Sequence, residues 1–216
     1  MAKLYAVLTG DIIGFSDYDQ MVRVHILDHL QTVLSHDLAP FSVVQKPDIF
    51  RGDSFQCLLQ KPEMALRSAV FIRGGLRTLQ FYPSVKYDSR ISIGIGTIDH
   101  TEKDEIDIKD GQAYRLSGHL LDSMKGRERL LFATPWPQID RELNAAAGLI
   151  DVLIEQWTPD RADAVLKSLN GKNQKEIANM HKISQPAVSK RLSGAGEWAL
   201  KKYLEYFEKK VIELTS

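Results

Sequence analysis

The chain has 216 residues, 44% of them hydrophobic, which is enough for one large domain or two small ones. Lys and Arg number 28 and Asp and Glu number 28, so the chain is neutral, and its single cysteine, Cys57, excludes an intrachain disulfide and a cysteine zinc site. No apolar stretch approaches membrane-spanning length and no signal-peptide pattern follows Met1, so we expect a cytoplasmic protein without a membrane partner.

The first feature in chain order is an apolar run that ends at an aspartate. Residues 4–10 predict a buried strand, Asp11 follows it, and Gly14 and Ser16 predict a turn and the start of a helix that reaches about Leu38. A carboxylate is a ligand for a hard divalent cation, and a helix N-terminus offers N–H groups to phosphate. This turn is therefore a candidate site for a metal and a nucleotide. The alternative is an aspartate that only caps a turn.

The next segments complete an α+β pattern. Further strands are expected at residues 41–50, 54–60, 90–98 and 129–133, and further helices at 62–79 and 111–124. Ser92, Gly94 and Gly96 leave one face of the 90–98 strand almost bare, which predicts the close approach of another backbone, a helix or a ligand. The order is β-α-β-β-α-β with an extra helix and strand, which is typical of the ferredoxin-like, palm-like fold.

This topology predicts where two carboxylates meet. In the ferredoxin-like arrangement the third strand lies antiparallel to the first, so the end of one is next to the start of the other. Asp11 and Asp53 stand at these two places. Because like charges repel unless a cation lies between them, the sequence predicts a paired-carboxylate site for Mg²⁺ or Mn²⁺. The alternative is that one aspartate faces water.

Several short strings resemble known families. Residues 11–16 (Asp-Ile-Ile-Gly-Phe-Ser) and 52–55 (Gly-Asp-Ser-Phe) are similar to the two metal-binding motifs of class III nucleotidyl cyclases, and residues 92–96 resemble the strand that follows them. The stretch 4–133 also resembles the SatD-like family of bacterial proteins, whose DG-A-Y/F segment is matched at 110–114.

The resemblance implies roles for individual residues. It implies Asp11 and Asp53 as metal ligands, with the Ile12 carbonyl as a further ligand. It implies nucleotide contacts at Gly14, Phe15, Ser16, Arg51 and Arg115. Cyclases carry an Asn and an Arg where this chain has Arg115 and His119, so we expect nucleotide binding with poor cyclisation.

Two later helices carry apolar residues at alternating steps of four and three, the spacing of a coiled-coil seam. In the connecting segment 136–159 these residues are Ile139, Leu143, Ala146, Ile150, Leu153 and Trp157, and in the last helix they are Leu200, Leu204, Phe207, Val211 and Leu214. Each seam either forms a dimer or packs on its own domain.

Residues 160–216 contain a helix-turn-helix pattern. Asn173 and Glu176 form a capping box for one helix, Ser184 caps the next, and Ile183 and Val188 stand at the positions of a hydrophobic staple. The string resembles sigma-factor region four and related regulators, whose recognition helix enters the major groove of DNA. Eleven Lys or Arg against seven Asp or Glu in this segment favour nucleic acid as its partner.

The expected DNA contacts lie on and around the last helix of this motif. The candidate residues are Lys172, Lys175, Ser184, Gln185, Ser189, Lys190 and Arg191. Gln reads adenine, and Lys reads guanine or holds phosphate, so Gln185, Ser189 and Lys190 are the base-reading candidates. The alternative is a helical hairpin used only for protein contact.

These patterns predict a SatD-like, cyclase-like domain at 1–135, a connecting helix at 136–159 and a helix-turn-helix domain at 160–216. The function that follows is a homodimeric, DNA-binding transcriptional regulator whose first domain senses a metal or a nucleotide. One alternative is an active nucleotidyl cyclase or other nucleotidyltransferase with an accessory helical tail. The other is a structural palm domain that has lost its ligand and serves for dimerisation.

Overall fold

An apolar strand in the first dozen residues forms the centre of a five-stranded sheet. The strands are β1 (Tyr5–Ile12), β2 (Asp48–Phe50), β3 (Ser54–Leu59), β4 (Ser89–Gly96) and β5 (Leu130–Ala133), in the order β2-β3-β1-β4-β5. Neighbouring strands are antiparallel except β4 and β5, which are parallel. The computed structural model describes residues 2–44, 47–50, 52–82, 84–99 and 110–215.

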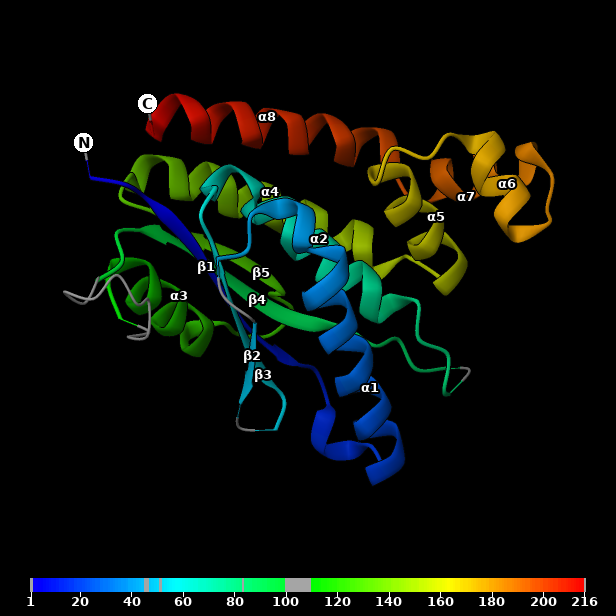
Figure 1. Cartoon of the computed structure of the whole chain (residues 1–216), viewed down its shortest axis with the longest axis horizontal. Coiled ribbons are helices and arrows are strands. Elements are labelled where there is room, and N and C mark those ends of the chain that lie inside the picture. Colours follow the sequence, from blue (N-terminus) through cyan, green and yellow to red (C-terminus); the bar gives the residue numbers. More distant parts are fainter. Residues whose placement is uncertain (1, 45–46, 51, 83, 100–109, 216) are drawn as a thin grey trace.

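Helices cover both faces of this mixed α+β sheet (Figure 1). They are α1 (Gln20–Thr32), α2 (Ala65–Arg77), α3 (Gln112–Ser123), α4 (Pro137–Glu155), α5 (Pro159–Leu169), α6 (Gln174–His181), α7 (Gln185–Gly194) and α8 (Glu197–Thr215). Helices α1, α2 and α4 lie on one face and α3 on the other, while α8 runs outside α2 and α4. Helices α5, α6 and α7 form one end of the molecule, and both chain termini lie at the opposite end.

The strands alternate between two differently filled faces. Leu8, Phe55 and Ile93 belong to the main apolar core beneath α1 and α2. On the other face α3 approaches the backbone of β4 closely, since a Cβ atom at Gly94 would lie 2.3 Å from the Ala113 carbonyl oxygen. The bare strand face seen in the sequence is therefore the docking surface of a helix.

Two boundaries differ from the sequence expectation. The first α-helix begins at Gln20 and not at Ser16, because the Asp19 side chain accepts the capping hydrogen bond from the Val22 N–H at 2.9 Å. The strand expected from residue 41 does not begin there, because Ala39–Phe41 form a 3-10 helix and Ser42 takes a left-handed φ of 62°. The described residues that follow form a bridge between Val43 and Leu59 and the strand β2.

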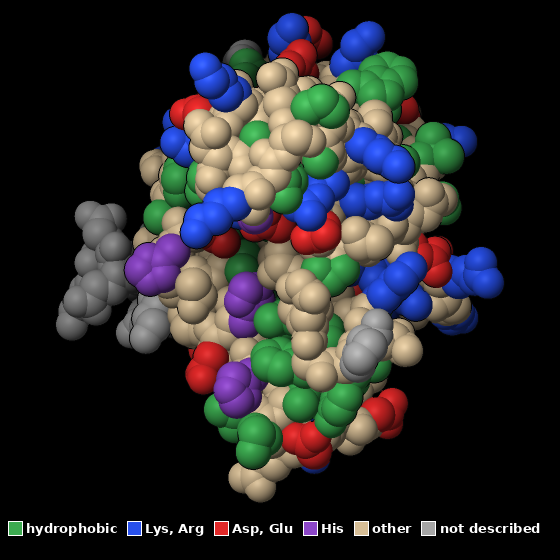
Figure 2. Space-filling model, turned by 90° about the vertical axis from the view of Figure 1, so that its right-hand side faces the viewer, with side chains coloured by type: hydrophobic (Ala, Val, Ile, Leu, Met, Phe, Trp, Pro, Cys, Tyr) green, Lys and Arg blue, Asp and Glu red, His purple; other side chains and the backbone are tan. Residues whose placement is uncertain are grey.

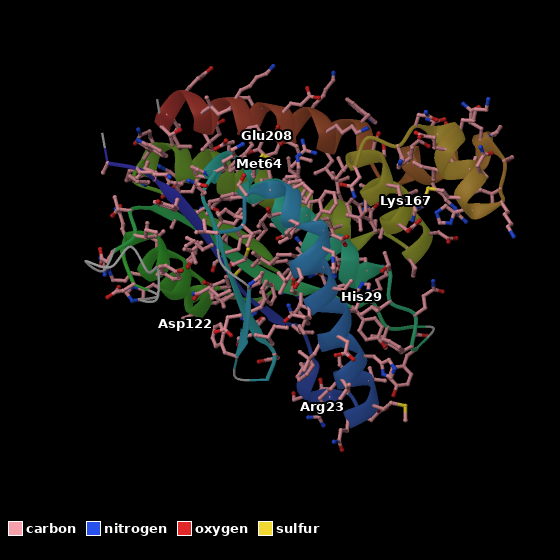
Figure 3. All side chains as sticks on the ribbon, viewed as in Figure 1. Arg23, His29, Met64, Asp122, Lys167 and Glu208 are labelled. Atoms are coloured by element: carbon pink, nitrogen blue, oxygen red, sulfur yellow. The ribbon has the colours of Figure 1, made fainter. Side chains whose placement is uncertain are left out.

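The seam residues of the last helix, α8, pack inside the chain. Leu200, Leu204 and Phe207 on α8 are at most 1% exposed, and Phe207 contacts Phe132 at a ring-centroid distance of 5.4 Å. Figure 3 shows Glu208 on α8 beside Met64, where α8 crosses the start of α2. The alternative that this helix packs on its own body is therefore the one observed.

One apolar core runs through all three predicted segments. Trp157, at the end of the connecting segment, is 1% exposed, and its indole N–H donates to the Ala195 carbonyl oxygen at 2.9 Å. Residues on either side of positions 135 and 159 belong to the same cluster. The predicted boundaries therefore do not interrupt the packing, and α5, against which α6 and α7 pack, lies directly on α2.

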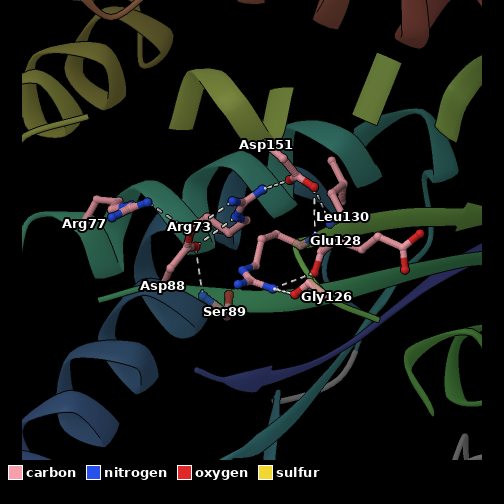
Figure 4. A network of polar contacts seen from close by, with 9 residues as sticks. Arg73, Arg77, Asp88, Ser89, Gly126, Glu128, Leu130 and Asp151 are labelled. Carbon is pink, nitrogen blue, oxygen red and sulfur yellow. Dashed lines mark hydrogen bonds and ion pairs between the residues drawn. The ribbon is translucent and has the colours of Figure 1, made fainter. Parts of the chain in front are cut away.

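A buried arginine links these layers (Figure 4). The Arg73 side chain on α2 is 1% exposed, donates from Nε to Asp88 at 2.9 Å, and forms an ion pair with Asp151 on α4. Asp151 also accepts the Arg129 N–H at 2.9 Å, at the start of β5. Burial by itself would raise the pKa of Asp88, but the charge and hydrogen bonds of Arg73 outweigh it and lower this pKa.

We expect Arg73→Met to lower the free energy of unfolding by about 3–5 kcal/mol, because it leaves two carboxylates buried without their partner. The matched control is Arg67→Met on the same helix, which breaks the more exposed pair of Arg67 with Glu208 and should cost about 0–1 kcal/mol. Urea denaturation at neutral pH measures both. A loss for Arg73→Met no larger than for Arg67→Met would contradict a structural role for the network.

Candidate functional site

A polar cleft of about 450 Å³ lies between one edge of the sheet and α3. The sheet contributes Thr9, Asp11 and Gln56, and the helix contributes Arg115 and Asp122. Thr9 ties the two walls together, because its hydroxyl bonds to the Ser117 hydroxyl on α3 at 2.9 Å and accepts from the Gln56 amide at 3.1 Å. The cleft thus has a fixed, hydrogen-bonded floor and carboxylates on both walls.

The carboxylate of Asp11 is held by an arginine on the neighbouring strand. Asp11 lies directly opposite Arg90 in the β1–β4 ladder, and Arg90 Nε donates to Asp11 Oδ1 at 2.9 Å while Nη2 donates to Oδ2. This hydrogen-bonded pairing raises the pKa of Arg90, with further contributions from the charges of Asp53 and Asp122. Asp11 therefore binds this guanidinium directly, and the charges of Asp53 and Asp122 also favour its ionised form.

Asp53 directly precedes β3 and is not the residue opposite Asp11. The ends of β1 and β3 are neighbours, but Asp11 faces Ser54 in the register, while the Asp53 carbonyl oxygen accepts from the Ile12 N–H at 3.2 Å. The cleft is lined by Asp11 and not by Asp53, whose carboxylate accepts the Ser54 hydroxyl at 3.4 Å. The Ile12 side chain is buried in the core.

This arrangement does not fit a resident Mg²⁺ or Mn²⁺. Both oxygens of Asp11 are engaged by Arg90, and no group of three or more His, Cys, Asp or Glu in the described ranges could hold a metal ion. Arg90 supplies the positive charge that the sequence pattern predicted for a metal ion. A divalent ion at Asp11 would first have to displace this guanidinium.

The expected nucleotide-binding residues are not gathered in one place. Gly14 (φ 67°) caps the 3-10 helix Phe15–Asp17, and neither it nor Ser16 lines the cleft. At the start of α1 the Asp19 carboxylate already accepts one of the free N–H groups, that of Val22. Arg51 lies outside the described residues.

Arg115 is the expected nucleotide contact that lines the cleft. Its guanidinium donates from Nη1 to Asp110 at 2.7 Å and lies 3.8 Å from Asp99, at the start of α3. Both of these ion pairs are exposed to solvent, so water weakens them and an incoming anion can compete for the arginine. His119 lines the same cleft and is exposed.

At the other end of the molecule, α6 and α7 form a helix-turn-helix with the predicted caps. The Asn173 side chain accepts from the Lys175 and Glu176 N–H groups at 3.0 Å, and Glu176 accepts the Asn173 N–H at 2.8 Å. Lys182 turns the chain with a left-handed φ of 54°. The Ser184 hydroxyl oxygen then accepts the Ala187 N–H at 3.4 Å to start α7.

The side chains of α7 are divided between the core and the solvent. Val188 and Leu192 are buried, while Gln185, Ser189 and Lys190 are exposed. Figure 2 faces this end of the molecule and shows Lys and Arg side chains gathered over its upper half, where α5–α8 lie. All three expected base-reading residues on this helix are therefore exposed to solvent.

The basic candidates differ in how free they are. Lys175 and Lys190 make no ion pair within the part of the chain that the structure describes. Arg191 is held by Asp160 at 2.8 Å, and Lys172 lies 3.9 Å from Glu176. Of these four basic candidates, Lys175 and Lys190 are therefore the two without an ion pair among the described residues.

The residue that sequence reasoning missed is Arg90. Period-two alternation in the 90–98 strand places Arg90 on the same face as Ser92 and Gly94, next to the first strand. The signal was present, but the choice of Asp11 as its partner depends on the register of two strands far apart in sequence.

No protein-family model matches this chain, and no curated protein matches it by sequence. No helix in the described ranges is long and apolar enough to cross a membrane. The function therefore has to be argued from the two surfaces described above.

We expect Arg90→Gln to increase the affinity for Mn²⁺ by about tenfold or more, because it removes the cation that engages both carboxylate oxygens of Asp11. Electron paramagnetic resonance of free Mn²⁺ measures this binding. Adding Asp11→Asn to Arg90→Gln should reverse the gain. Tight Mn²⁺ binding by the native chain, abolished by Asp11→Asn alone, would instead restore the paired-carboxylate metal site.

Proposed function

We propose that this protein is a DNA-binding transcriptional regulator in which α7 is the recognition helix and the sheet domain is a ligand sensor. The observation that carries the proposal is the division of α7, which buries Val188 and Leu192 and exposes Gln185, Ser189 and Lys190 after a capped turn. A recognition helix requires this division, since one side anchors it and the other reads base edges.

The sheet domain is proposed to have the ferredoxin-like, cyclase-like arrangement that the SatD-like resemblance implies. The support is the strand order β2-β3-β1-β4 with antiparallel neighbours, to which β5 adds one parallel strand. Its cleft is within the size range of small-molecule sites, and Arg115 on its wall suits the phosphates of a nucleotide. Binding of this nucleotide is proposed not to require a metal, because Arg90 already neutralises Asp11.

The active-cyclase alternative has less support. It needs two free carboxylates for metal ions, and Asp11 is engaged by Arg90. It also needs an amide and a guanidinium where the chain has Arg115 and His119. We therefore favour a binding domain over a catalytic one.

A homodimer is proposed because one recognition helix reads only a half-site, and two copies pair two of them. The seam residues of α8 are buried within the chain, so a dimer has to use another surface. The α4 helix offers one, since Leu149 is 71% and Val152 is 51% exposed on its outer side.

Lys190→Ala is expected to weaken binding to a preferred DNA site by about 1–3 kcal/mol and to relax the sequence preference, because Lys190 is placed to contact a base. Fluorescence anisotropy with a panel of genomic fragments measures both effects. The matched control is Lys209→Ala, which removes the same charge from an exposed position several turns along α8. Equal losses for the two variants would contradict a base-reading role for α7.

Lys175→Ala is expected to weaken binding to all fragments alike and to reduce the slope of log affinity against log salt by about one, because it removes a phosphate contact. Titrations at two or more salt concentrations measure this slope.

Val188→Asp should abolish binding by burying an unpaired charge in the motif. DNA affinity that survives Val188→Asp would show that another surface binds the DNA.

A further inference from the structure

A second cavity, of about 170 Å³, lies where the C-terminal ends of α2 and α4 meet the residues that precede β4 and β5. Arg77 is the last residue of α2, Glu155 is the last of α4, and Arg129 directly precedes β5. None of its described lining residues is shared with the cleft beside α3. It is therefore a separate place in the fold.

The lining of this cavity carries more positive than negative charge. Its cations are Arg73, Arg77, Lys86, Arg127 and Arg129, and its anions are Asp88, Asp151 and Glu155. Arg73 is paired with two of these anions, Asp88 and Asp151. The lining as a whole therefore carries two positive charges in excess.

The cations other than Arg73 are mostly held by neutral groups. Lys86 donates to the Glu155 backbone carbonyl at 2.8 Å, and Arg129 donates to the backbone carbonyls of Gly126 and Glu128. A carbonyl oxygen accepts a hydrogen bond but does not neutralise a charge. Arg127 adds an exposed guanidinium at the rim.

Arg77 has donors that the protein does not use. The residue is 5% exposed, and its guanidinium reaches Asp88 through Nη2 at 3.3 Å. Its Nε and Nη1 atoms are buried and have no hydrogen-bond partner among the described residues. Burial lowers the pKa of Arg77 and the nearby charges of Arg73 and Arg129 lower it further, against the opposing charges of Asp88 and Glu155. Unused donors on a buried cation are unfavourable unless an acceptor fills them.

We propose that this cavity binds a small oxyanion of the phosphate class, which accepts a hydrogen bond from an unused N–H donor of Arg77 and is attracted by the charges of Lys86, Arg127 and Arg129. Hydrogen bonds from a guanidinium to an anionic oxygen are stronger than those between neutral groups. A dianion balances the two excess charges of the lining. The volume suits a phosphate group with a few waters and is below the range of whole small-molecule ligands.

Isothermal titration of the full chain with inorganic phosphate, against chloride at matched ionic strength, tests the proposal. We expect the native chain to bind with a Kd of about 1 mM or tighter. Arg77→Gln should bind about tenfold or more weakly, because it removes the donors that hold the anion. The matched control is Arg67→Gln on the same helix, which should bind as the native chain does, because Arg67 pairs with Glu208 away from the cavity.

Circular dichroism checks that Arg77→Gln is folded. If it is not, Arg127→Gln provides the test, because this exposed residue lines the cavity and its loss should weaken phosphate binding several-fold. No phosphate binding by the native chain, or equal weakening by Arg67→Gln and the cavity variants, would overturn the proposal.

A second titration distinguishes the source of the phosphate group. If a nucleoside triphosphate binds more tightly than phosphate and Arg77→Gln removes this difference, the site holds the terminal phosphate of a larger molecule. If Arg77→Gln weakens phosphate but leaves triphosphate binding unchanged, the site takes the free ion and the nucleotide binds elsewhere. If triphosphate binding depends on Arg115 and not on Arg77, the triphosphate binds in the cleft of the proposed sensor. The titration with inorganic phosphate then decides whether the cavity at Arg77 binds an oxyanion.

Discussion

The structure depends on how one buried cation is neutralised. Arg73 lies in the middle of α2, where sheet and helices exclude water, so its charge has to be met by the protein. Asp88, which directly precedes β4, and Asp151, which lies on α4, neutralise this charge. The same α4 leads to Trp157, which bonds to the end of α7 through Ala195. A charge pairing inside the sheet domain thus positions the platform of the helix-turn-helix.

The same requirement distinguishes the two polar cavities. In the cleft beside α3, Arg90 binds both carboxylate oxygens of Asp11, and the charges of Asp53 and Asp122 also favour its ionised form. In the cavity at the ends of α2 and α4, Arg77 has two donors left over. A metal ion therefore finds no free carboxylate oxygen on Asp11 in the cleft unless Arg90 moves, whereas an anion gains hydrogen bonds in the cavity at the ends of α2 and α4.

Features that depend on neighbours in sequence could be predicted. The capping box of Asn173 and Glu176, and the cap at Ser184, are local hydrogen bonds, and the bare face at Gly94 follows from alternation along one strand. Features that depend on distant partners could not. The pairing of Asp11 with Arg90 requires strand register, and the seam spacing of α8 is the same whether the helix packs on its own body or on a second copy. The helix expected from Ser16 begins at Gln20, because the side chain of Asp19 and not that of Ser16 accepts the capping hydrogen bond.

The most direct test of the central claim is to find where on the DNA the exposed side of α7 lies. Cys57 is buried and burial raises the pKa of its thiol to about 12, so it reacts slowly, and a photo-crosslinker attached through Ser189→Cys reports on this position alone. The account predicts crosslinks to bases within a bound fragment, and none from the same group attached through Lys209→Cys on α8. Crosslinks from Lys209→Cys without crosslinks from Ser189→Cys, with both variants bound to DNA, would contradict α7 as the recognition helix.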